Sequence, residues 1–95
     1  PTKAFPMAQA VVDPEQLRQF AAMLKRYTQQ VRESTTSLSQ AQARLADSWR
    51  DQEHRKFVDE FEEQIKLVHK LLESSEQHIP YLLKKAEIID EYLQR

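Results

Sequence analysis

The chain has 95 residues, of which 14 are Lys or Arg and 15 are Asp or Glu, so its formal net charge is −1. This balance excludes the strongly basic surface that binding to nucleic acid or to an anionic membrane requires. Because the chain contains neither cysteine nor glycine, thiol chemistry, cysteine-bound metals and glycine-rich phosphate loops are excluded as well.

The N-terminal segment carries no recognisable signal. Residues 1–12 precede the first sign of a helix and are expected to be flexible, or in part left from an expression tag. No apolar run has the length of a signal peptide or of a membrane span. We therefore expect a cytoplasmic protein, or one secreted without a cleaved signal peptide, and no insertion into membranes.

A first helix is predicted over residues 14–47. Asp13 is a suitable N-cap, Pro14 suits the first helical position, and Glu15 places a negative charge in the first turn. One heptad series of this helix consists of Leu17, Leu24, Val31, Leu38 and Leu45, and its partner series consists of Phe20, Tyr27, Ser34, Ala41 and Ser48. The two series predict a single apolar stripe.

A second helix is predicted over residues 52–94. Its stripe follows a strict 3-4 spacing through Val58, Phe61, Ile65, Val68, Leu72, Ser75, Ile79, Leu82, Ala86, Ile89 and Leu93. Pro80 lies within this stripe and predicts a kink near His78 and Ile79, or alternatively a third helix that begins at Pro80.

Reversal of the chain at Trp49 and Arg50 brings the two stripes together. Residues whose numbers add to 99 then face each other, for example Leu38 with Phe61 and Leu17 with Leu82. The length fits one domain over residues 1–95, and the abundance of strong helix formers indicates the all-α class. The predicted architecture is an antiparallel two-helix hairpin.

The corner of this hairpin contains the only tryptophan. We expect Trp49 to close the end of the interhelical seam against Leu45 and Phe57. Asp51 is expected either to cap the second helix or to adopt the left-handed conformation that Asp tolerates.

The corner resembles the turn of the WXG100, or ESAT-6-like, family of small helical hairpins. The resemblance covers the length of the chain, the turn at Trp49, and the aromatic residues Phe57 and Phe61 after it. Asp51 stands where the family motif has glycine, and no Tyr-x-x-x-Asp/Glu motif follows Tyr81 or Tyr92. The resemblance implies a non-enzymatic, dimeric substrate, adaptor or chaperone-like partner of a type VII secretion system. A chain without that motif is expected to travel with a partner that carries one, or to remain inside the cell.

Further apolar residues of the second helix lie outside its stripe. The first helix is expected to lack a second apolar series of this kind. These residues of the second helix predict an interface with a partner helix and consist of Leu67, Leu71, Tyr81, Ile88 and Tyr92. The expected assembly is a four-helix bundle formed with a second copy or with a related hairpin, and the secretion machinery or a toxin are further candidate partners.

No catalytic, metal-binding or cofactor-binding residues are predicted. His54, His69 and His78 lack the i, i+4 spacing of a helical zinc pair. The acidic cluster around Glu60 and Glu62 is expected on a solvated face. The alternative function is an intracellular helical scaffold or regulatory bundle that is unrelated to secretion.

Overall fold

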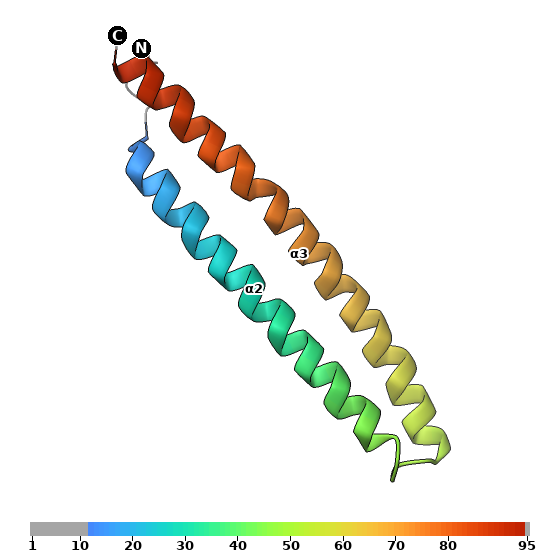
Figure 1. Ribbon diagram of the computed structural model, residues 1–95. Coiled ribbons are helices and arrows are strands. Elements are labelled where there is room, and N and C mark those ends of the chain that lie inside the picture. Colours follow the sequence, from blue (N-terminus) through green and yellow to red (C-terminus); the bar gives the residue numbers. More distant parts are fainter. Residues whose placement is uncertain (1–11, 95) are drawn as a thin grey trace.

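The chain folds into two long antiparallel helices. The computed structural model describes residues 12–94, so the expectations for residues 1–11 lie outside the described part of the chain. Helix α2 spans Pro14–Leu45 and helix α3 spans Gln52–Leu93. The helices run side by side in opposite directions (Figure 1), and they contact each other along their length. These findings confirm the predicted all-α hairpin, and residues 12–94 contain no strand.

Both helices begin at an aspartate N-cap. The Asp13 side chain accepts a hydrogen bond from the backbone N–H of Glu15 at 2.9 Å, and the Asp51 side chain accepts one from the N–H of His54 at 3.0 Å. Each bond satisfies a backbone donor that has no partner within the helix. Helix α2 ends two residues before the predicted position, because Asp47 and Ser48 donate their N–H groups to the carbonyls of Arg44 and Leu45 in a tight turn.

Helix α3 continues through Pro80 without interruption. The single second helix predicted over residues 52–94 is therefore confirmed, and the alternative of a third helix that begins at Pro80 is wrong. Pro80 is exposed to solvent, and only one backbone hydrogen bond is lost at a proline. Ile79 and Leu82, on either side of Pro80, are half-buried.

The stripe predicted on α3 faces α2 almost as expected. All of its members from Val58 to Ile89 are buried or half-buried, whereas Leu93, the last residue of α3, is exposed. On α2, Leu17, Leu24 and Val31 face α3 as predicted, but Leu38 and Leu45 are exposed.

The partner series predicted on α2 is wrong. Phe20, Tyr27, Ser34, Ala41 and Ser48 are all exposed. The residues that face α3 lie one position later, and they are small or polar: Ala21, Thr28, Thr35 and Gln42. Small side chains allow two helix axes to approach closely, because interaxial distance depends on the side chains at the contact.

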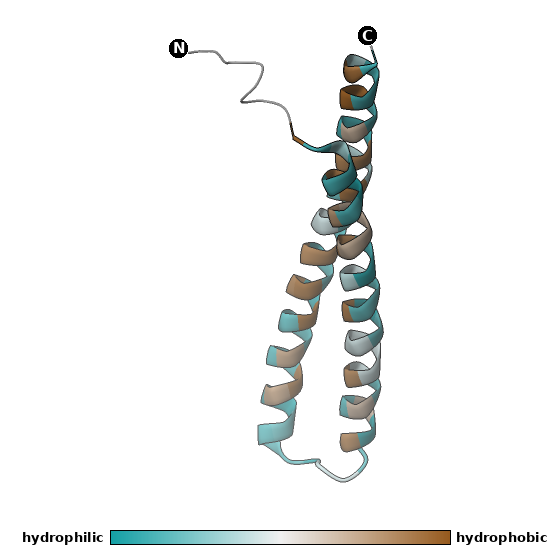
Figure 2. Cartoon of the chain, turned by 90° about the vertical axis from the view of Figure 1, so that its left-hand side faces the viewer, coloured by the Kyte–Doolittle hydropathy of each residue, from teal (hydrophilic) through white to brown (hydrophobic). Residues whose placement is uncertain are grey.

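The tightly packed core lies away from the turn. Ala21, Thr28, Leu72 and Ala86 are at most 1% exposed, and no residue between Gln29 and Leu71 is buried. The Thr28 hydroxyl donates a hydrogen bond to the carbonyl of Lys25 at 2.9 Å, so the buried polar group is satisfied. In the view of Figure 2, the helices overlap in this half and diverge toward the turn. Because a groove lined by both helices remains near the turn, the seam is open there.

Register also differs between the two halves of the hairpin. Leu38 and Phe61 line a common groove near the turn, as the predicted register requires. Further from the turn, Arg32 pairs with Glu76 and Arg18 pairs with Asp90. In each ion pair the two residue numbers add to 108, whereas the predicted register pairs residues whose numbers add to 99. The predicted pairing of Leu17 with Leu82 therefore does not describe the half that holds the core.

Candidate interaction surface

Asp51 and Trp49 form the corner between the helices. The φ angle of Asp51 is −88° and its backbone is extended, so the N-cap alternative is confirmed and the left-handed alternative is wrong. Trp49 is half-buried. Its backbone N–H donates a hydrogen bond to the carbonyl of Leu45 at 3.0 Å. This bond ties the main chain of Trp49 to the end of α2.

Aromatic rings continue from the corner along the first three turns of α3. The centroid of the Trp49 ring lies 4.8 Å from that of His54 and 5.6 Å from that of Phe57. Phe57 in turn stacks on Phe61 with their centroids 5.9 Å apart. These separations are typical of favourable aromatic pairs. The row of rings holds Phe57 and Phe61 in fixed positions at the open end of the seam.

Phe57 and Phe61 form one wall of an apolar groove on the turn half. The other wall comes from α2, and the lining residues are Leu38, Ala41, Gln42, Leu45, Phe57 and Phe61. Leu38, Leu45 and Phe57 are 40–56% exposed. Leu38, Leu45 and Phe57 therefore lie on the same face of the hairpin, which we call the apolar face.

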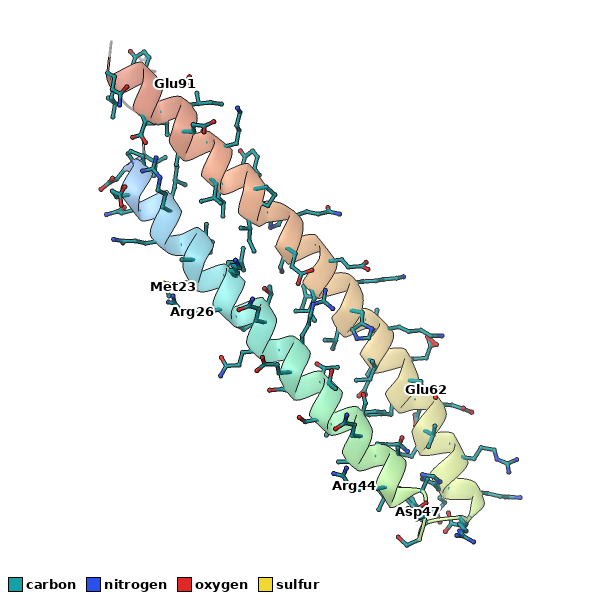
Figure 3. The ribbon with its side chains drawn as sticks, viewed as in Figure 1. Met23, Arg26, Arg44, Asp47, Glu62 and Glu91 are labelled. Atoms are coloured by element: carbon teal, nitrogen blue, oxygen red, sulfur yellow. The ribbon has the colours of Figure 1, made fainter. Side chains whose placement is uncertain are left out.

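Helical periodicity extends the apolar face along α2. Phe20 and Tyr27 lie at heptad spacing before Ala41, and both are exposed. Met23 follows on the same side, and Figure 3 shows its side chain pointing away from α3. From Phe20 to Ala41 the positions on this side carry no charge: they are Phe20, Met23, Tyr27, Gln30, Ser34, Ser37 and Ala41.

The same periodicity extends the apolar face along α3. Leu71 and Tyr92 lie at heptad spacing from Phe57, and therefore on its side of the helix. Leu67, Tyr81 and Ile88 lie next to them, further from α2. These five residues are the predicted partner interface, and each is between 53% and 66% exposed.

The opposite face of the hairpin is charged. Arg32 donates two hydrogen bonds to the carboxylate of Glu76, at 2.9 and 2.7 Å, and Arg18 bonds to Asp90. The hydrogen bonds from Arg32 lower the pKa of Glu76, and the same bonds raise the pKa of Arg32. Leu83 lies seven residues from both Glu76 and Asp90, and so belongs to this ion-pair face.

The ion-pair face also has a groove between the two helices, lined by both polar and apolar side chains. Its lining residues are Ser39, Gln42, Phe61, Glu62, Ile65, Lys66 and His69. Within residues 12–94, no three His, Asp or Glu side chains are grouped so that they could hold a metal ion. Over the same range, neither helix has the length of apolar sequence needed to cross a membrane.

Sequence reasoning missed the contribution of α2 to the apolar face. Phe20, Tyr27, Leu38 and Leu45 are large and apolar, and the heptad pattern therefore predicts them in the interhelical seam. The signal that could have found them is the series Ala21, Thr28 and Thr35, four residues after Leu17, Leu24 and Val31. This series offers α3 a surface of small side chains and leaves the larger ones outside.

Comparison with known proteins places the chain in a family. A comparison with curated proteins and a comparison with solved structures each found no match. The family model described as "Proteins of 100 residues with WXG" matches residues 9–87. This range includes the corner at Trp49, the aromatic row and most of both helices. The chain belongs to the WXG100 family.

Proposed function

We propose that the protein is a non-enzymatic partner of a type VII secretion system, acting as a substrate, adaptor or chaperone-like hairpin that works as a dimer. Membership in the WXG100 family supports the link to this kind of secretion. The observation that supports dimerisation is the apolar face, to which both helices contribute large exposed side chains.

The composition of the apolar face supports a protein interface. Cores of interfaces are depleted of charge and enriched in aromatic residues and Met. The α2 side of this face has Phe20, Met23 and Tyr27, and it carries no charge before Arg44. A hairpin of two helices buries little surface on its own, so a partner on this face would complete its core. The expected assembly is a four-helix bundle.

A pair of matched variants tests the dimer. Leu71→Glu places a charge on the apolar face, whereas Leu83→Glu makes the same change on the ion-pair face. Leu71→Glu should shift the sedimentation coefficient toward that of a monomer, because a carboxylate buried without a partner opposes association. Leu83→Glu should leave the dimer intact. Equal effects of the two variants would contradict the proposed interface.

The type VII assignment has a separate test. A tagged copy of the chain is produced in the bacterium that encodes it, with and without the ATPase of the secretion system. We expect the chain in the culture medium, alone or with a co-secreted partner, only when the ATPase is present. Unchanged localisation without the ATPase, together with no bound secretion protein, would favour the intracellular scaffold.

A further inference from the structure

Lys85 places a positive charge on the apolar face. It lies seven residues before Tyr92 and fourteen after Leu71, so heptad spacing places it in the row of α3 that borders α2 on this face. Tyr81 and Ile88, four residues before it and three after it, lie beside it on the same helix. Lys85 is therefore surrounded by residues of the predicted partner interface.

The surroundings of Lys85 leave its charge without a counter-charge. Lys85 is half-buried, whereas Tyr81 and Ile88 beside it are exposed. A lysine typically buries its alkyl stem along apolar surface and keeps its ammonium group in water. The neighbouring Lys84 forms an ion pair, but Lys85 forms none with any residue from 12 to 94. In a single hairpin the ammonium group therefore depends on solvent for its hydrogen bonds.

A partner on the apolar face removes this solvent. Any helix that covers Tyr81, Ile88 and Tyr92 also covers Lys85, which lies among them. An ammonium group that loses water without gaining a counter-charge opposes association. A carboxylate that accepts its hydrogen bonds replaces much of the lost solvation. The apolar face therefore distinguishes between partners by the group that they place opposite Lys85.

A second copy of the chain offers few carboxylates on this face. Its α2 side carries no charge from Phe20 to Ala41. In the two α3 rows of the face, over residues 57–92, Glu60 is the one carboxylate. Glu60 lies seven residues before Leu67, and therefore outside the predicted interface residues. A second copy thus brings large apolar side chains to the face and leaves the lysine uncompensated.

We infer that Lys85 determines the specificity of the apolar face, by favouring a helical partner that places an Asp or Glu side chain opposite it over a second copy of this chain. This inference rests on the proposed dimer interface and names the chemistry of the partner. The exposed apolar side chains still support a self-dimer at tens of micromolar, because several of them act against one lysine. The self-dimer is the weaker of the two assemblies.

A change of charge at constant length tests the effect of Lys85 on self-association. Lys85→Met should lower the Kd of the self-dimer by about tenfold or more, because it removes a desolvated charge and keeps the apolar stem. Sedimentation equilibrium measures this Kd. Lys84→Met is the matched control and should change the Kd by less than about twofold, because Lys84 forms an exposed ion pair with Glu87 at 3.3 Å. A Kd for Lys85→Met that equals or exceeds that of the unmutated chain overturns the inference.

Probe chains with an added carboxylate test the preference for an acidic partner. Gln30→Glu, Gln64→Glu and Ser74→Glu each add one negative charge at a different place on the apolar face. At least one labelled probe should bind the unmutated chain about fivefold or more tightly than it binds Lys85→Met, because only the unmutated chain offers an ammonium group. This order is the reverse of the order expected in self-association. Fluorescence anisotropy measures the affinities, Lys84→Met should behave as the unmutated chain, and circular dichroism verifies that the helices are retained.

The outcomes separate the inference from the proposed function. If every probe binds Lys85→Met at least as tightly as the unmutated chain, the inference is overturned and the proposed dimer stands. If the unmutated chain is monomeric but binds a probe, and Lys85→Met forms a dimer, the inference is supported and the self-dimer is contradicted. If all chains remain monomeric alone and with every probe, the inference and the dimer interface are both overturned.

Discussion

At the scale of single residues, Asp51 shows how the chain forms its corner without the glycine of the family motif. A glycine at this position would supply conformational freedom. Asp51 instead has an extended backbone, with φ −88°, and its carboxylate caps α3. The corner is therefore fixed by a hydrogen bond to the first turn of the helix, and a left-handed turn is not required.

Substitution of Asp51 distinguishes capping from turn geometry. Asp51→Ala should lower the free energy of unfolding by about 1 kcal/mol, and Asp51→Gly by only a few tenths of that amount, because glycine is tolerated at N-caps. Urea unfolding at a fixed protein concentration measures both values. A gain in stability with glycine would contradict the capping role.

Trp49 provides a second prediction at this scale. Its ring contacts His54 and Phe57, but it is only half-buried. Trp49→Ala should therefore cost about 2 kcal/mol, less than the 3–5 kcal/mol typical of a large aromatic residue removed from a core. Trp49→Phe is the matched control and should retain most of the stability. An unchanged urea midpoint in the alanine variant would indicate that the ring serves only as a contact to another protein.

At the scale of the helices, the sequence predicted α3 well because its pattern is unambiguous. Apolar residues, interrupted only by Ser75, recur from Val58 to Ile89 at a strict 3-4 spacing. Both helix starts could also be predicted, since a capping aspartate is a local signal. A single helix through Pro80 was predicted as well, and the alternative of a third helix remained open because proline suits both a helix start and a tolerated helix interior.

The seam of α2 was predicted only in part for a physical reason. Leu17, Leu24 and Val31 are flanked by two series, one with Phe20 and Tyr27 and one with Ala21 and Thr28. Hydrophobicity favours burial of the series with large side chains, whereas close approach of two helices favours burial of the series with small side chains. Periodicity alone cannot weigh these effects. For the same reason, the residues that α2 contributes to the apolar face could not be predicted from the sequence.

The ion pair between the helices makes stability depend on pH. Hydrogen bonds from Arg32 lower the pKa of Glu76 in the folded state. The folded protein therefore binds this proton less tightly than the unfolded chain does, and stability is lost as the pH falls from the ordinary value of 4.5 through the lower folded value. In both Glu76→Gln and Arg32→Gln, Tm should fall less steeply as the pH is lowered through this range. Thermal unfolding monitored by circular dichroism at a series of acidic pH values measures it. A profile that is unchanged in both variants would contradict a role for the pair.

At the scale of the whole molecule, the two faces of the hairpin differ in chemistry. One face carries the cross-helix ion pairs, and the other carries exposed Phe, Tyr, Leu and Met side chains from both helices. A monomer would leave the apolar face in water, and large exposed apolar patches usually mark interaction sites. The open seam near the turn adds to this face, because Leu38 and Phe57 are 56% and 40% exposed in the described part of the chain. The hairpin therefore resembles one half of a four-helix bundle, with one face left for a partner.

Sedimentation velocity of the unmutated protein tests this central claim most directly. The run is made at tens of micromolar and repeated at a tenfold lower concentration. Burial of a Leu, Ile or Phe side chain contributes about 1.5–3 kcal/mol, and several such residues on each copy offset the entropic cost of association. The account predicts a species with twice the mass of the chain at the higher concentration. A monomer at both concentrations, with the apolar face left in solvent, would contradict it.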